Sequence, residues 1–132
     1  MEKIVLDTYA VISFFYNEKG ADDVEKILIN AKEKNIPIFI SAVNYAELFY
    51  AVLKKSGADA AMKAIEMIDL IPVEVIEVDR NLALLAGSYK ETKKMSFADC
   101  FSAALAKIFN AAIVTGDKEF FKVEKEVKIL WI

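Results

Sequence analysis

Short apolar stretches alternate along this chain with longer segments in which apolar residues recur every three or four positions. The short stretches predict β-strands, because continuous apolar runs of this length are typical of parallel strands buried on both faces. They lie at residues 3–6, 37–40, 73–78, 112–115 and 128–132. The third stretch, VEVIEV, alternates apolar and acidic residues, which predicts an edge strand with one face toward water.

The longer segments predict amphipathic helices between the strands. They lie at residues 8–16, 21–34, 42–55, 58–70, 80–93 and 97–110. Pro37 begins one predicted strand and Pro72 comes just before another, and at both places proline ends the preceding helix. Strands that alternate with helices predict an α/β fold with a parallel sheet. With 132 residues, 56% of them apolar, and no Gly- or Ser-rich linker, residues 1–132 are expected to form one domain.

Charge and cysteine content restrict the setting in which the chain works. Seventeen basic residues stand against 20 acidic ones, so the surface has no overall basic character and any contact with nucleic acid must be local. The single cysteine, Cys100, cannot form an intramolecular disulfide, which favours a reducing, cytoplasmic location. Asp7 interrupts the apolar N-terminal stretch, and no stretch of 18 apolar residues occurs, so we expect neither a signal peptide nor a membrane span.

Two absences narrow the possible chemistry. The chain contains no histidine, which excludes Ser-His-Asp and Cys-His catalysis, paired-histidine RNA cleavage and histidine zinc sites. Its four glycines lie far apart, so it has neither a phosphate-binding P-loop nor a dinucleotide-binding fingerprint. Any catalysis would therefore depend on carboxylates.

Four acidic residues fall at one predicted edge of the sheet. Asp7 directly follows the first predicted strand, and Asp117 follows the fourth. Glu47 lies in the second turn of the helix after the second strand, and Asp99 lies in the first turn of the helix before the fourth. Helices that connect parallel strands run antiparallel to them, so these positions share the carboxyl edge, where open α/β sheets bind ligands.

Each of these acids also has a purely structural interpretation. Asp7 and Asp117 occupy positions typical of helix caps or turns, and Asp99 follows a serine at the spacing of a capping box. Glu47 shares one side of its helix with Asn44, and that side could simply face solvent.

The alternative is a common site for all four acids. Several carboxylates that converge repel one another, and this arrangement is tolerated mainly around a cation. Oxygen ligands without histidine or thiolate favour Mg²⁺ or Mn²⁺ over zinc. Such ions are suited to phosphate chemistry.

The four acids lie in short motifs, which are D-T-Y-A at 7–10, S-A-V-N-Y-A-E-L at 41–48, S-F-A-D at 96–99 and T-G-D-K-E-F at 115–120. With these motifs the chain resembles, over essentially its whole length, the PIN-domain ribonucleases and in particular the VapC-type toxins of toxin–antitoxin systems.

The resemblance implies a three-layer α/β/α fold with a five-stranded parallel sheet of order 3-2-1-4-5. It also implies roles for particular side chains. The metal-binding and catalytic residues would be Asp7, Glu47, Asp99 and Asp117, and the supporting residues would be Thr8, Asn44 and Thr115. Asn44 stands where related toxins commonly carry threonine, and its amide could still position an acid or contact RNA.

The function implied is a Mg²⁺- or Mn²⁺-dependent endoribonuclease with an RNA substrate, a VapB-like antitoxin as partner and a homodimeric state. The helices expected at 42–55 and 58–70 are apolar on more than one face, in keeping with a dimer. The candidate dimer contacts are Tyr45, Phe49, Tyr50 and Met62. The candidate cations for phosphate are Lys3, Lys54, Arg80, Lys90, Lys93, Lys94 and Lys118.

Other functions remain possible at this point. A housekeeping RNA-processing nuclease would use the same residues, and a catalytically silent PIN-like module would bind RNA or protein without needing the four acids. A phosphorylated receiver domain is also an α/β protein with an acidic pocket. It requires paired acids after the first strand, whereas Asp22 and Asp23 begin a helix, and a lysine after the last strand, where this chain ends at Ile132.

Overall fold

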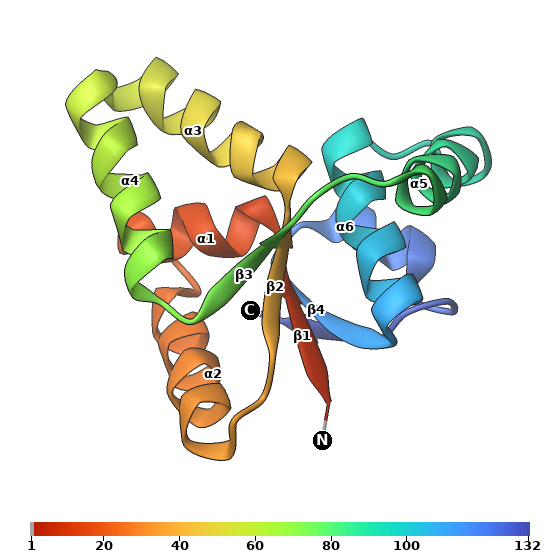
Figure 1. Ribbon diagram of the computed structural model, residues 1–132, viewed down its shortest axis with the longest axis horizontal. Coiled ribbons are helices and arrows are strands. Elements are labelled where there is room, and N and C mark those ends of the chain that lie inside the picture. The colour runs from red at the N-terminus through yellow and green to blue at the C-terminus, as the bar shows by residue number, and fades with distance from the viewer. Residues whose placement is uncertain (1) are drawn as a thin grey trace.

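The computed structural model describes residues 2–132, which form a parallel sheet with helices on both faces (Figure 1). The strands are β1 (Lys3–Leu6), β2 (Ile38–Ser41), β3 (Val73–Ile76), β4 (Ala111–Thr115) and β5 (Ile129–Trp131). Their order in the sheet is β3-β2-β1-β4-β5, and each neighbouring pair is parallel. The predicted α/β fold and strand order are therefore confirmed, with the VEVIEV strand at an edge.

The helices form the two outer layers. They are α1 (Thr8–Phe15), α2 (Ala21–Lys34), α3 (Ala42–Ser56), α4 (Ala58–Leu70), α5 (Arg80–Lys93) and α6 (Phe97–Phe109). The first four lie on one side of the sheet and the last two on the other (Figure 1). No helix within residues 2–132 is long and apolar enough to cross a membrane.

Successive residues of the central strands belong to two different cores. Ile4 and Leu6 of β1 pack among α1 to α4, whereas Val5 packs on the opposite face among α5 and α6. In β4, Val114 belongs to the core beside α1 to α4, and Ile113 belongs to the core beside α5 and α6. Because both faces of these strands are covered, their sequences are continuously apolar.

Most element boundaries agree with the prediction to within two residues, and local backbone conformations explain the differences. Helix α6 ends at Phe109 because Asn110 adopts a left-handed conformation, with φ of 52°. Gly57, with φ of 89°, joins α3 directly to α4. A 3₁₀ helix, η1 (Lys118–Val123), was not predicted.

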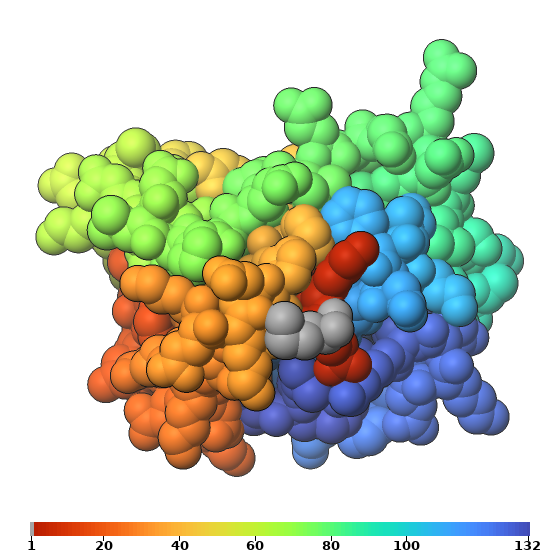
Figure 2. Space-filling model, turned by 60° about the horizontal axis from the view of Figure 1, so that its bottom comes forward, coloured from red at the N-terminus to blue at the C-terminus, as the bar shows by residue number. Residues whose placement is uncertain are grey.

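The strand register places the site at the carboxyl edge. Leu6 is paired with Val114, so the next residues, Asp7 and Thr115, lie side by side where β1 and β4 end. At the opposite edge, the orange segment near the end of α2 and the blue segments near the end of α6 lie on either side of the red segment that begins β1 (Figure 2). Lys3 lies at that opposite edge, with Nζ 5.9 Å from the centre of the Phe109 ring, and is therefore remote from the acids.

Candidate active site

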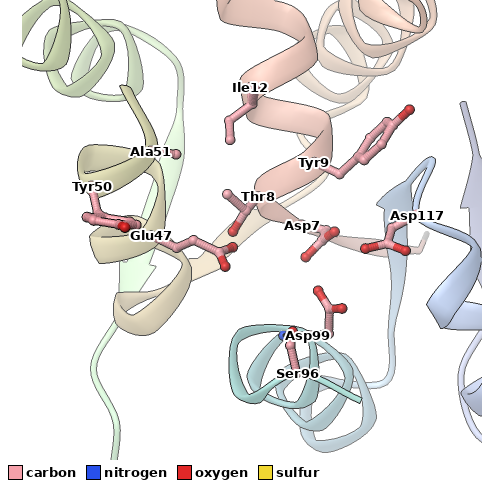
Figure 3. Close-up of a pocket in the computed structure, with 10 residues that line it drawn as sticks. All are labelled: Asp7, Thr8, Tyr9, Ile12, Glu47, Tyr50, Ala51, Ser96, Asp99 and Asp117. Atoms are coloured by element: carbon pink, nitrogen blue, oxygen red, sulfur yellow. Dashed lines mark hydrogen bonds between the residues drawn. The ribbon is translucent and has the colours of Figure 1, made fainter. Parts of the chain in front are cut away.

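A cavity of about 350 Å³ opens at the carboxyl edge of the sheet, and all four predicted acids line it (Figure 3). Asp7 follows β1, Glu47 projects from α3, Asp99 lies in the first turn of α6, and Asp117 follows β4. The other lining residues are Thr8, Tyr9, Ile12, Tyr50, Ala51 and Ser96. The fold thus brings together four acids that are far apart in sequence.

Asp7 is enclosed in the protein and held by two hydroxyl groups. It is only 1% exposed. Ser102 donates a hydrogen bond to its Oδ1 at 3.0 Å, and Thr115 donates one to its Oδ2 at 2.9 Å. Although Asp7 occupies the N-cap position of α1, its side chain makes no capping hydrogen bond. The interpretation of Asp7 as a helix cap is therefore wrong, and its carboxylate is instead held in a fixed orientation at the cavity.

The contact from Ser102 was not predicted from the sequence. This serine is fully buried in α6, three residues after Asp99 and thus on the same face of the helix. A lone hydroxyl within the apolar segment that follows Asp99 was the available signal, because a buried polar group requires a hydrogen-bond partner.

Asp99 faces Asp7 across the cavity (Figure 3). It does not cap its own helix, since the side chain of Ser96 does so by accepting a hydrogen bond from the Asp99 amide at 3.3 Å. Asp117 differs in this respect. Its Oδ1 accepts a hydrogen bond from the amide of Glu119 at 2.9 Å, so Asp117 caps η1 as well as lining the cavity.

Asn44 connects three elements around the site. It is fully buried, so the side of α3 that it shares with Glu47 does not face solvent at this position. Its Nδ2 donates to Thr8 Oγ1 at 3.0 Å and to the carbonyl of Ala98 at 3.2 Å, and its Oδ1 accepts a hydrogen bond from the Ser41 hydroxyl. Asn44 thereby ties the starts of α1, α3 and α6 together. Glu47, three residues further along α3, lines the cavity beyond Thr8 (Figure 3).

Burial and the closeness of the acids raise the pKa values of Asp7 and Asp99. Burial is the main cause that raises the pKa of Asp7 to about 7, the nearby charge of Asp99 raises it further, and the hydrogen bonds from Thr115 and Ser102 oppose the rise. Burial, followed by the charge of Asp117, raises the pKa of Asp99 to about 6. Burial and the neighbouring charges thus make both carboxyl groups harder to ionise when no cation is bound.

The residues of the cavity fit a hard divalent cation. No lysine or arginine within residues 2–132 lines it, so the described protein supplies no positive charge to balance the acids. In the same part of the chain, no three acidic or cysteine side chains lie close enough to enclose an ion together. Mg²⁺ needs only one or two carboxylates because it retains several waters. The facing pair of Asp7 and Asp99 meets that requirement.

The predicted cations do not reach this cavity, since none of them is among its lining residues. Lys93 is paired with Glu126 at 2.6 Å, and Lys90 donates a hydrogen bond to the carbonyl of Met95 at 2.8 Å. Any contact of these side chains with a phosphate chain would therefore lie outside the cavity.

Comparison with known proteins agrees with the fold. The family model of the PIN domain matches residues 4–126. Among solved structures, VapBC2 from Rickettsia felis, bound to a promoter DNA fragment, matches with 22% identity over 98% of each chain and a TM-score of 0.78. DNA-bound VapBC from Salmonella typhimurium matches with 22% identity over 98% of each chain and a TM-score of 0.76. VapC20 from Mycobacterium tuberculosis, a toxin that cleaves the sarcin-ricin loop, matches with 18% identity over 90% of this chain and 93% of its own, at a TM-score of 0.73. No curated protein matches the chain.

Proposed function

The chain belongs to the PIN-domain family, and from this premise we propose that it is a metal-dependent endoribonuclease whose active site is the carboxylate cavity. One observation carries the proposal. Asp7 is buried, is held by two hydroxyl groups and faces Asp99, in a cavity where no described cation balances the charge. A buried carboxylate with a raised pKa that is held in this way marks a functional site more often than a structural one.

We assign each side chain of the cavity a role in this reaction. Asp7 and Asp99 would hold Mg²⁺ or Mn²⁺, with Asp117 contributing through a bound water, while Thr115 and Ser102 fix the orientation of both Asp7 oxygens. When bound, the ion supplies Lewis-acid stabilisation of the phosphate and makes water more acidic. Glu47 lies where it would accept a proton from the attacking water or hold a second ion. Because the chain has no histidine to take a proton from water, it needs an ion or a carboxylate for that step.

The test compares rate with melting temperature on the same preparations. The protein should cleave unpaired RNA with Mg²⁺ or Mn²⁺ present, and EDTA should abolish cleavage. Asp7→Asn should lower the rate by about a hundredfold or more, the scale expected when a metal site is disrupted, without lowering the melting temperature. Asp69→Asn, an exposed position on α4, is the matched control and should cleave normally. Undiminished cleavage by Asp7→Asn would reject the proposal.

We further propose that a VapB-like antitoxin controls the activity, which makes the protein a toxin. The similarity to VapBC complexes supports this more than it supports a housekeeping nuclease or a silent module. An arginine or lysine of the partner inserted among the carboxylates would replace the positive charge of the metal. Inhibition should then compete with Mg²⁺. A small DNA-binding protein encoded next to this gene would identify the partner, and inhibition that is indifferent to Mg²⁺ would place its contact elsewhere.

A homodimer is the remaining proposal about assembly. Tyr50 on α3 and Met62 on α4 are 59% and 50% exposed, and both are therefore available for contact. The other two candidates, Tyr45 and Phe49, pack against the core beside α1 to α4, so their side chains are largely used within the monomer. Light scattering should report a dimer at micromolar concentration that Met62→Lys weakens. A monomer before substitution would contradict this.

A further inference from the structure

A second cavity, of about 340 Å³, adjoins the carboxylate cavity. It is lined by Tyr9, Ile12, Ser13, Glu18 and Lys19. Tyr9 and Ile12 line both cavities, so the two are neighbours along one turn of α1. Each has the size of a small-ligand site, roughly 300–1,000 Å³. The second cavity contains none of the four acids of the first and offers an aromatic ring and a lysine instead.

Tyr9 lines this cavity with its ring. The residue is 40% exposed, and its hydroxyl points away from Asp7 (Figure 3). No hydrogen bond among residues 2–132 involves that hydroxyl. The ring is positioned by close packing on Gly116, where an added Cβ would lie 2.4 Å from Tyr9 Cε1 and 2.9 Å from Cζ. A glycine between Thr115 and Asp117 is thus what allows the ring to lie against the backbone beside the acids.

Lys19 provides the positive charge that the first cavity lacks. It is exposed and forms no salt bridge with another residue of the described chain. The one acid that shares its cavity, Glu18, is paired with Lys55 at 3.6 Å. The ammonium group of Lys19 is therefore available to a ligand that approaches from solvent.

An exposed aromatic ring beside a free lysine is the combination by which proteins bind unpaired nucleotides, because bases stack on the ring and cations contact the phosphates. We propose that Tyr9 stacks on the base of the nucleotide next to the scissile phosphate, and that Lys19 contacts the RNA backbone beyond it. This inference rests on the proposed nuclease function. It assigns the substrate path to the second cavity, which lies along α1.

Binding can be measured without cleavage on the Asp7→Asn background, with a short unpaired RNA, Mg²⁺ and fluorescence anisotropy. Adding Tyr9→Leu should weaken binding by about tenfold to a hundredfold, the loss expected for one base–aromatic stack. Tyr9→Phe should bind nearly as well as tyrosine, because it keeps the ring. Phe121→Leu, at a ring that is 53% exposed but lines neither cavity, is the matched control and should bind normally.

An abasic nucleotide provides the complementary change in the RNA. One abasic position should weaken binding as much as Tyr9→Leu does, and it should have no further effect in that variant, because both changes remove the same stack. Lys19→Ser should reduce the slope of log K against log salt by about 0.7, the value for one phosphate contact on a single strand. The proposal is overturned if the abasic effect persists in Tyr9→Leu, or if Phe121→Leu weakens binding equally.

The two proposals can fail separately. If the unsubstituted protein does not cleave RNA but binding still depends on Tyr9 and on the matching base, the stacking site stands and the nuclease is wrong. If it cleaves RNA and binding is indifferent to Tyr9, the nuclease stands and the stacking site is wrong.

Discussion

The hydroxyl group of Thr115 donates a hydrogen bond to the carboxylate of Asp7 at 2.9 Å, across the ends of two neighbouring strands. The same oxygen accepts a hydrogen bond from the backbone amide of Asp117 at 3.0 Å. One buried side chain thus orients the acid that follows β1 and the residue that follows β4. A change at Thr115 should therefore disturb both acids together.

The raised pKa values of Asp7 and Asp99 predict how stability changes with pH. A carboxyl whose pKa is raised in the folded state binds its proton more tightly there than in the unfolded chain, so its contribution to stability falls as pH rises through that range. For Asp7 and Asp99 the folded pKa values are about 7 and about 6. With EDTA present, these two groups should lower the free energy of unfolding as the pH rises from about 4, the ordinary pKa of an aspartate, to about 7. Denaturant melts across this range should show the decline, and Asp7→Asn should reduce it. A decline of the same size in Asp7→Asn would contradict the assignment.

Metal binding should depend on Asp99. Asp99→Asn removes one ligand and part of the charge that attracts the ion, so calorimetry should show Mn²⁺ binding weakened by about tenfold to a hundredfold. The variant should remain folded, and its melting temperature without metal should rise, because a buried like charge is removed beside Asp7. Asp69→Asn should bind Mn²⁺ normally. Undiminished Mn²⁺ binding by Asp99→Asn would mean that the metal binds at another site.

The hydrogen bond from Ser102 should matter for the pH dependence of cleavage. It lowers the pKa of Asp7, so Ser102→Ala should raise that pKa further and shift the acidic limb of the pH–rate profile to higher pH. The lost hydrogen bond should also cost about 1 kcal/mol of stability. Ser88→Ala, at an exposed position on α5, should change neither the profile nor the melting temperature. A profile for Ser102→Ala that coincides with the unsubstituted one would mean that this serine is only a packing residue.

The fold was predictable because its signals are local. Continuous apolar runs marked the strands, and Pro72 marked the start of β3. The positions of the acids at the carboxyl edge followed from the direction of parallel strands and required no tertiary detail. The resemblance to the PIN family supplied the strand order, which local pattern alone leaves open.

The connections within the site were not predictable in the same way. The hydrogen bond from Ser102 to Asp7 spans 95 positions, and that from Asn44 to Thr8 spans 36. Such pairs depend on how helices pack across the end of the sheet, which no periodicity in the sequence reports. For the same reason Asp7 was open to interpretation as a helix cap, since its position before α1 is that of a cap and only the partners of its side chain show otherwise.

Substitution of Thr115 separates the role of its hydroxyl group from that of its volume. Thr115→Val keeps the shape but removes both hydrogen bonds, so Asp7 and the Asp117 amide each lose a partner, at a cost of about 1–3 kcal/mol for each group left buried and unsatisfied. Thr115→Ser keeps the hydroxyl and loses one methyl group, which should cost about 1 kcal/mol. If Thr115 orients the acids, the valine variant should cleave RNA far more slowly than the serine variant, measured as the rate per folded molecule at saturating Mg²⁺. If Thr115 only fills space, the two variants should cleave at similar rates per folded molecule, because the packing that serine disturbs then affects only stability. The ratio of these two rates therefore decides whether the hydroxyl between β1 and β4 belongs to the active site or to the core.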